Sequence, residues 1–373
     1  MSAAFFYGAL RDPGLRDIVL GPGARGARMQ PAVLPDHAVT WADGDALITA
    51  QAGAEAEGVL AEGLDPQAVL RLEFYAGGCG HSFSQDVQVS AAGAPHGARI
   101  WCAPAERNAQ GTPFDLAAWQ AGHGALARIA ATEAMEYFGT CSAQVLAARM
   151  PMIRARAASR LAATAVPAAL RSDTGADAVE AVRTEILHAG FYRVEARELR
   201  HPTFGGGMSD TLRREIFIAT DAALVLPYDP ARDRVLLVEQ FRIGPYGRGD
   251  PRPWMLEPVA GRVDLGETPE EAAHRECAEE AGLTLARLEK IGGYYCTPGY
   301  STEYFHNFVG IAELPNDLPR YGGLDSEAED IRLHVLDFAA AMDLIDTGEA
   351  DDGPLILSLL WLARHRERLR AAA

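Results

Sequence analysis

Cysteine, lysine and long apolar runs are scarce in this chain of 373 residues. Its five cysteines are odd in number and include no Cys-x-x-Cys pair, which argues against a disulfide framework and against a zinc knuckle. No apolar run reaches the length of a membrane span, and no basic start precedes an apolar segment at Met1. We therefore expect neither a transmembrane helix nor a signal peptide, and a cytoplasmic location.

Positive charge is also scarce, because 34 Lys and Arg face 51 Asp and Glu, for a formal net charge of −17. A surface of this sign repels phosphate backbones and anionic lipids, so we expect neither nucleic acid nor a membrane as a partner. The composition, 48% hydrophobic and 23% charged, is typical of a globular protein, and the length predicts two domains.

Acidic residues gather in one segment, residues 261–283. Thr268 is a good N-cap, Pro269 suits the first helical position, and Glu271 is placed to close a capping box. Gly282 can adopt the left-handed conformation that ends a helix. The segment therefore predicts a glycine loop followed by a short helix from about residue 269.

Three glutamates of this helix, Glu276, Glu279 and Glu280, have the spacing i, i+3, i+4 and should share one face. Like charges this close repel one another, so the cluster favours a bound cation. Carboxylate oxygens suit Mg2+ or Mn2+, which join protein carboxylates to substrate phosphates. The chemistry indicated is metal-assisted attack on a phosphate ester, and the alternative is a solvated acidic helix face.

The whole segment resembles the Nudix box: Gly, five residues, Glu, seven residues, Arg-Glu, an apolar residue, any residue, Glu-Glu, any residue, Gly and an apolar residue. The matching residues are Gly261, Glu267, Arg275, Glu276, Glu279, Glu280, Gly282 and Leu283. Cys277 stands where the family usually has a larger aliphatic residue. The resemblance implies hydrolysis of a nucleoside diphosphate linked to another group, with metal-activated water cutting the pyrophosphate.

The resemblance also implies a role for each matching position. Glu276 and Glu280 correspond to direct metal ligands, and the carbonyl of Ala260 to a third. Arg275 and Glu279 would orient these ligands without binding the metal themselves. Glu267 would brace the loop.

Two segments outside the box resemble the ADP-ribose pyrophosphatase subfamily. Residues 256–261 lead into the box, and residues 297–303 follow it, with Pro298 fifteen positions after Leu283. Residues 322–332 resemble the mobile catalytic loop of the subfamily, which implies Glu327 as the general base and Glu329 as a further metal ligand. An ordinary turn at Pro298 and an ordinary polar loop at 322–332 remain alternatives.

The same resemblance indicates substrate-binding residues, namely Arg214, Glu215, Arg242, Thr297, Pro298 and Glu303. Arginines suit bidentate contacts with phosphate, although either of these two could instead form a surface ion pair. Phe191 or Tyr192 could stack on adenine across a dimer or occupy an ordinary edge position.

The first part of the chain, before the Nudix segment, has sequence features of its own. Residues 5–11, with Leu20-Gly21, resemble the opening of gamma-glutamylcyclotransferase-like (AIG2-like) domains, in which backbone amides of this loop form a binding cavity. Ala76 stands at the position of the catalytic glutamate of that family. A methyl group cannot transfer a proton, so cyclotransfer would need Glu73 as a substitute. We expect a binding or assembly module.

These observations predict an α+β protein. A gamma-glutamylcyclotransferase-like β-barrel domain with helices is expected over residues 1–147, a helical linker over 148–180, and a Nudix domain over 181–373 with a mixed sheet sandwiched by helices. Strands are expected near 222–227, 235–240, 291–296, 305–311 and 331–336, and a closing helix over 354–370. The fusion is similar to the tellurite-resistance Nudix proteins of bacteria, although nothing in the sequence is expected to bind tellurite.

The predicted reaction is the Mg2+-dependent hydrolysis of ADP-ribose to AMP and ribose 5-phosphate, by a homodimer. One alternative is a Nudix hydrolase acting on other ADP-sugars or NADH. The alternatives from other classes are a non-hydrolytic ADP-ribose sensor and an N-terminal gamma-glutamylcyclotransferase.

Overall fold

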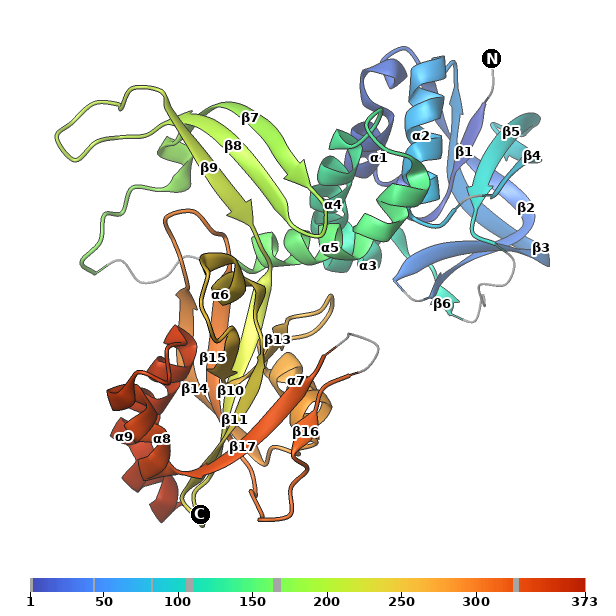
Figure 1. The fold of residues 1–373 in the computed structure, drawn as a ribbon. Helices are drawn as coiled ribbons and strands as arrows, with labels where there is room; N and C mark the ends of the chain where they lie inside the picture. The colour runs from blue at the N-terminus through green and yellow to red at the C-terminus, as the bar shows by residue number, and fades with distance from the viewer. Residues whose placement is uncertain are drawn as a thin grey trace. The chain divides into compact units, whose positions relative to one another are not determined.

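A computed structural model describes residues 3–42, 44–81, 83–104, 111–163, 169–324 and 329–372. The chain divides into two compact units, Met1–Pro167 and Ala168–Ala373, each drawn as part of the ribbon in Figure 1. Helix α5 (Ala143–Ala162) packs against α2 (Pro66–Gly78) and α4 (Ala125–Glu136) of the first unit. The segment expected to be a linker from residue 148 therefore begins with a helix that belongs to the first unit.

The first unit contains a closed five-stranded barrel. Its strands are β1 (Ala4–Phe6), β2 (Arg28–Ala42), β3 (Asp45–Glu62), β4 (Phe83–Ala91) and β5 (Ala94–Cys102). The pairing β1–β3–β2–β4–β5 returns to β1 through a parallel bridge from Ala4 to Arg99, which closes the barrel. A short strand, β6 (Thr112–Pro113), adds to β2. The predicted N-terminal barrel is confirmed.

Helices cover this barrel, and local sequence signals set where they begin. Asp12 caps α1 (Pro13–Leu20) and Asp65 caps α2, since each carboxylate accepts a hydrogen bond from the amide three residues later, at 2.8 and 2.7 Å. The remaining helical segments are α3 (Leu116–Trp119) and α4, joined by a π-helical turn over Gln120–Gly124. Along α2, Ala76 is buried whereas Glu73 is exposed.

The second unit contains a mixed sheet that has eight strands within the described residues. They are β10 (Asp221–Asp229), β11 (Arg234–Phe241), β12 (Trp254–Glu257), β13 (Val259–Arg262), β14 (Arg287–Tyr295), β15 (Tyr304–Ile311), β16 (Tyr321–Gly322) and β17 (Ile331–Asp337). Strands β10 and β15 are parallel and the other pairs antiparallel. The predicted mixed sheet is confirmed.

A split in the centre of this sheet creates room for the candidate site. Strands β10 and β11 pair only next to their hairpin turn, at Tyr228↔Val235 and Asp229↔Arg234. Beyond that point β13 pairs with β10 and β12 pairs with β11. The two short strands therefore lie in the gap between β10 and β11, and they bring the glycine loop to the middle of the sheet.

Helices lie on both faces of the sheet (Figure 1). Helix α7 (Pro269–Ala281) packs on Ala223, Val225, Leu236 and Val238. Helices α8 (Phe338–Thr347) and α9 (Gly353–Ala371) pack on the alternate residues Leu226, Tyr228, Val235 and Leu237. Because successive strand residues point to opposite faces, these apolar runs supply both cores, and each fully buried side chain contributes about 2 kcal/mol. Helix α6 (Ile243–Arg248) follows β11.

A separate three-stranded antiparallel sheet precedes this sandwich, formed by β7 (Glu180–Ala189), β8 (Arg193–Arg200) and β9 (Leu212–Ile218). Residues 212–217 lie in β9, and β10 follows them directly. Phe217 joins this sheet to the loop before β15 by hydrogen bonds with Tyr300 at 2.7 Å and Thr302 at 3.0 Å. Among the described helices, none is long and apolar enough to cross a membrane.

Candidate active site

Helix α7 begins and ends as its sequence predicts. The hydroxyl of Thr268 accepts a hydrogen bond from the amide of Glu271 at 3.2 Å, and the carboxylate of Glu271 accepts one from the amide of Thr268 at 2.8 Å. Gly282 ends the helix with a φ of 65°, a conformation that favours glycine. The capping box and the glycine together fix which residues of α7 face the sheet.

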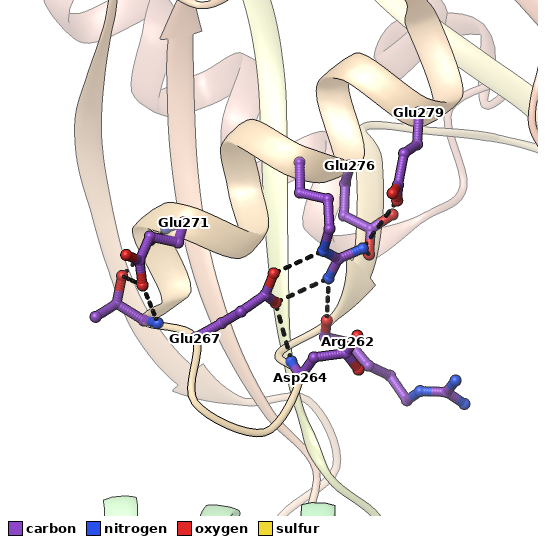
Figure 2. A network of polar contacts seen from close by, with 8 residues as sticks. Arg262, Asp264, Glu267, Glu271, Glu276 and Glu279 are labelled. Carbon is purple, nitrogen blue, oxygen red and sulfur yellow. Dashed lines mark hydrogen bonds and ion pairs between the residues drawn. The ribbon is translucent and has the colours of Figure 1, made fainter. Parts of the chain in front are cut away.

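Arg275 binds three glutamates at once. Its guanidinium donates to both carboxylate oxygens of Glu267 at 2.7 and 2.9 Å, and to Glu276 and Glu279 at 2.7 and 2.9 Å. It also donates to the carbonyl of Arg262 at 3.0 Å. Figure 2 shows Glu267 on one side of this guanidinium and Glu276 and Glu279 on the other. Arg275 therefore ties the glycine loop to two carboxylates of α7.

The glycine loop approaches Glu276 closely. A Cβ atom on Gly261 would lie 1.8 Å from a carboxylate oxygen of Glu276. Glycine at this position is therefore needed for space, since any side chain would displace that carboxylate. Glu267 completes the loop by accepting a hydrogen bond from the amide of Asp264 at 3.1 Å.

The three clustered glutamates differ in their burial and in their partners. The Glu280 residue is only 1% exposed, and its carboxylate accepts a hydrogen bond from the amide of Ala260 at 3.3 Å. The side chain of Glu279 is 32% exposed and belongs to the Arg275 network. Glu280 points toward the sheet, next to the backbone of β13.

Burial changes the acidity of two of these carboxylates. Burial raises the pKa of Glu276 to about 7, against the opposing charge of Arg275, and nearby Glu279 and Glu329 raise it further. Burial raises the pKa of Glu280 to about 8, with additional repulsion from Glu276 and Glu329. These two acids therefore lie close to each other in a place that disfavours negative charge unless a cation is supplied.

Glu329 lies close enough to Glu276 and Glu280 to raise the pKa of both. Its carboxylate accepts a hydrogen bond from the amide of Leu324 at 3.3 Å. A Cβ on Gly322 would lie 1.7 Å from the carbonyl oxygen of Glu280, so strand β16 packs directly on the end of α7. Gly323 has a φ of 92°, which favours glycine, and a Cβ added there would lie 2.9 Å from the Cβ of Glu329. Glu327, the predicted general base, lies outside the described residues.

Arg242 lies at the end of β11 and pairs with a residue for which the sequence predicted no role. Its Nε atom lies 3.0 and 2.8 Å from the two carboxylate oxygens of Glu257, the last residue of β12. Glu257 pairs with Val238, whose side chain belongs to the core under α7. The carboxylate of Glu257 therefore faces the α7 side of the sheet, where Glu280 lies.

Comparison with known proteins identifies this arrangement. Residues 219–359 match the NUDIX domain family. The ADP-ribose pyrophosphatase of Escherichia coli (strain K12) is 38% identical over 196 residues, which are 52% of this chain and 93% of that protein. The chain belongs to the Nudix family. It is a Nudix diphosphatase, so the predicted class of hydrolase is confirmed.

Two other relatives of this Nudix protein are an ADP-ribose pyrophosphatase and a GDP-mannose pyrophosphatase. The ADP-ribose pyrophosphatase of Haemophilus influenzae (strain ATCC 51907 / DSM 11121 / KW20 / Rd) is 34% identical over 194 residues, 52% of this chain and 89% of that protein. The GDP-mannose pyrophosphatase of Escherichia coli (strain HS) is 33% identical over 150 residues, 40% of this chain and 77% of that protein. Nucleoside diphosphate sugars are the substrates that these names share.

The donor set of the Nudix box fits a divalent metal. Within the described ranges, no three side chains of His, Cys, Asp or Glu lie close enough together to hold a metal ion. The side chain of Glu276 is nevertheless only 12% exposed and Glu280 is buried, and the two carboxylates repel each other near the backbone of Ala260. Oxygen donors with unbalanced negative charge suit Mg2+ or Mn2+.

The predicted substrate-binding residues fall into two places. Thr297 and Pro298 lie in the loop between β14 and β15, where the carbonyl of Thr297 accepts hydrogen bonds from the next turn. Glu303 ends this loop and accepts a hydrogen bond from the thiol of Cys296 at 3.2 Å. Because Asp221 pairs with Tyr304 and Ala222 with Arg262, this loop and the glycine loop share one edge of the sheet.

Arg214 and Glu215 lie elsewhere, on β9 of the three-stranded sheet. Both side chains are exposed; Arg214 donates to the carbonyl of Arg213 at 3.1 Å, and Glu215 accepts from the guanidinium of Arg213 at 2.7 Å. Within the described part of the chain, no hydrogen bond or ion pair joins them to α7. Their hydrogen bonds are made to Arg213, within the three-stranded sheet itself.

Two acids near Arg242 were missed at the level of sequence. Glu257 was read only as part of the segment leading into the box, and its pairing depends on the register of β12, which no local pattern reveals. Asp352 caps α9 by accepting a hydrogen bond from the amide of Leu355 at 2.8 Å. Burial raises the pKa of Asp352 to about 6, and the nearby Glu257 adds to the rise. The Asp-Gly-Pro sequence signalled the cap but gave no sign that it lies near Arg242.

Proposed function

We propose that this Nudix hydrolase cleaves ADP-ribose to AMP and ribose 5-phosphate with Mg2+ or Mn2+. The observation that carries this proposal is the 38% identity to an ADP-ribose pyrophosphatase, which spans 93% of that protein and therefore extends far beyond the box. The arrangement of Glu276 and Glu280 supports it, because it places two carboxylates that repel each other next to the backbone of Ala260 in β13.

In this proposal Glu276, Glu280, Glu329 and the carbonyl of Ala260 would hold the metal, which would supply Lewis acidity toward the diphosphate and lower the pKa of water. Arg275 and Glu279 fix the carboxylate of Glu276 through the contacts at 2.7 and 2.9 Å. Glu327 acts as the general base that accepts a proton from the attacking water. Thr297, Pro298, Glu303 and Arg242 contact the substrate from the neighbouring edge of the sheet.

A substrate screen with the purified full chain tests the proposal. ADP-ribose, ADP-glucose, GDP-mannose, NADH and diadenosine polyphosphates are each incubated with Mg2+, and an added phosphatase releases phosphate only from the monoesters that hydrolysis creates. We expect ADP-ribose to give the highest kcat/KM. The absence of activity on every ADP-sugar would overturn the proposal, whereas a preference for another compound would correct the substrate.

GDP-mannose enters this screen for a specific reason. A GDP-mannose pyrophosphatase is 33% identical to this chain over 150 residues. The same box chemistry serves both substrates, because the base and sugar lie away from the metal. A higher kcat/KM for GDP-mannose than for ADP-ribose would make this second candidate the correct one.

For the first unit we propose a gamma-glutamylcyclotransferase-like domain without cyclotransferase activity. Ala76 is 5% exposed in the core between α2 and the barrel, and Glu73 faces solvent, so neither offers an acid inside the domain. We expect no release of 5-oxoproline from glutathione or from gamma-glutamyl dipeptides. Turnover of either compound by the purified chain would contradict this assignment.

We also propose a homodimer, supported by two aromatic side chains that one chain leaves about half exposed. Phe191 and Tyr192, at the turn between β7 and β8, are 53% and 49% exposed. A second copy that covers them could also bring Arg214 and Glu215 to the active site. Light scattering coupled to gel filtration should give twice the mass of one chain, and a monomeric mass at micromolar concentration would exclude the dimer.

A further inference from the structure

The contact between Arg242 and Glu257 uses one particular atom of the guanidinium. Nε donates to both carboxylate oxygens of Glu257, at 3.0 and 2.8 Å. The side chain of Glu257 is 14% exposed and that of Arg242 is 39% exposed. Within the part of the chain that the structure describes, the two terminal nitrogens of Arg242 have no hydrogen-bond partner. The N–H groups of these two nitrogens therefore remain available to a ligand.

The pair lies beside the carboxylates of the Nudix box. Glu257 precedes Ala260 by three residues, and its register with Val238 places it on the face covered by α7. Arg242 is close enough to Glu280 that its positive charge opposes the rise in the pKa of Glu280 that burial causes. The free end of Arg242 and the proposed metal ligands therefore belong to one site.

Two further polar residues lie near this pair. Gln240 lies near Glu257, and Asp352 lies near both Glu257 and Arg242. Asp352 is itself fixed as the cap of α9 by the bond of 2.8 Å to the amide of Leu355. An ion pair between exposed side chains contributes little to stability. The side chain of Glu257, in contrast, is only 14% exposed. The carboxylate of Glu257 therefore orients the guanidinium of Arg242.

We propose that Glu257 is a positioning residue that holds Arg242 by Nε, so that the two terminal nitrogens of Arg242 bind the diphosphate of the substrate. This inference rests on the proposed function. Two parallel N–H groups match two oxygens of a diphosphate, and an arginine already held at Nε loses less rotamer freedom when it binds. Lysine cannot form both contacts, so its substitution for Arg242 should remove the benefit of Glu257.

A double-mutant cycle on the full chain tests this coupling. The variants are Glu257→Gln, Arg242→Lys and the two together, each assayed with ADP-ribose and Mg2+. Because the diphosphate is bound in the ground state and in the transition state, we expect Glu257→Gln to raise KM about tenfold with little change in kcat. In the Arg242→Lys background the same change should alter KM less than about twofold, because the held atom is gone. Equal effects in both backgrounds would overturn the proposal.

Matched variants separate positioning from folding. Glu257→Asp keeps the charge and should recover part of the lost affinity. Glu239→Gln removes a carboxylate of the neighbouring strand β11 that also has a side-chain partner, His334 at 2.7 Å. This change should leave KM unchanged. Melting temperatures of all variants are measured alongside. A rise in KM in Glu239→Gln equal to that in Glu257→Gln, or a KM for Glu257→Gln equal to wild type, would refute the role of Glu257.

A second measurement keeps this inference apart from the proposed function. If the wild type hydrolyses none of the nucleoside diphosphate sugars, the proposed function fails, and the cycle is repeated with the binding of ADP by calorimetry. Weaker ADP binding in Glu257→Gln, absent in the Arg242→Lys background, supports the positioning role. A failure of ADP to bind the wild type, or an additive cycle, overturns it.

Discussion

At the scale of single residues, Gly261 shapes the site by having no side chain. A Cβ there would lie 1.8 Å from a carboxylate oxygen of Glu276, which Arg275 holds at 2.7 Å. Gly261→Ala should therefore push this carboxylate aside and lower kcat about a hundredfold, because small displacements at a reacting centre are costly. Steady-state kinetics checks the change. Gly205→Ala is the control, since nothing lies within 4 Å of its added methyl group, and equal activity in both variants would contradict the prediction.

Glu280 lends itself to a variant that separates catalysis from stability. Burial raises its pKa to about 8, so the ionised carboxylate destabilises the fold unless a cation is bound. Glu280→Gln should lower kcat/KM about a thousandfold or more through loss of the metal, without lowering the free energy of unfolding. The rise in melting temperature that Mg2+ gives the wild type should vanish in this variant.

Glu270→Gln is the matched control for this experiment. It changes an exposed acid in the first turn of the same helix α7. Both the activity and the effect of Mg2+ on melting should persist there. Wild-type turnover in Glu280→Gln would remove this residue from the metal site.

At the scale of elements, the turn between β10 and β11 holds α9 through Asp233. Its carboxylate accepts hydrogen bonds from Arg366 and from Tyr228, at 2.7 and 2.8 Å, and pairs with Arg370 at 2.7 Å. The bond from Arg366 is the main reason that the pKa of Asp233 falls from 3.8 to about 2, although burial opposes it. Ionised Asp233 therefore stabilises the fold above pH 4, and this contribution is lost as the pH falls toward 2.

Asp233→Asn should lower the free energy of unfolding by about 2 kcal/mol at pH 7, and the difference from wild type should shrink as the pH falls from 4 toward 2. Asparagine tolerates the left-handed backbone conformation of this position, where φ is 58°. Urea unfolding at a series of pH values measures the difference. Asp346→Asn, an exposed change in α8, should show no such trend, and a difference that stays constant with pH would refute the linkage.

The same elements show what a sequence can and cannot specify. Both ends of α7 were predictable, because the signal for each end is local. Thr268 and Glu271 act within the first helical turn, and Gly282 ends the last one. The inward direction of Glu280 was not, because it depends on where β13 crosses beneath the helix. The partner of Arg242 was hidden for a similar reason, since Arg242 and Glu257 meet only when β12 pairs with β11. Local signals fix local structure, while contacts across the sheet depend on register.

At the scale of the whole molecule, the two units should be separable without loss of hydrolysis. Each has hydrophobic cores of its own, and every candidate site residue, from Arg214 to Glu329, belongs to the second unit, Ala168–Ala373. Between α5 and β7 the described residues 169–179 are almost all exposed, and Arg171 is among them. Exposed segments between domains are the preferred sites of proteolysis.

Brief trypsin treatment of the native chain should therefore cut first after Arg171. The C-terminal fragment should keep the wild-type kcat/KM, because cleavage breaks no contact within the sheet, α7 or the loops around the Nudix box. Mass spectrometry identifies the cut, and the same digest of Arg171→Gln should leave the chain intact over that time. If the cut chain loses hydrolysis while the melting transition of its second unit persists, then the first unit contributes to the active site, and the division of labour between the units must be revised.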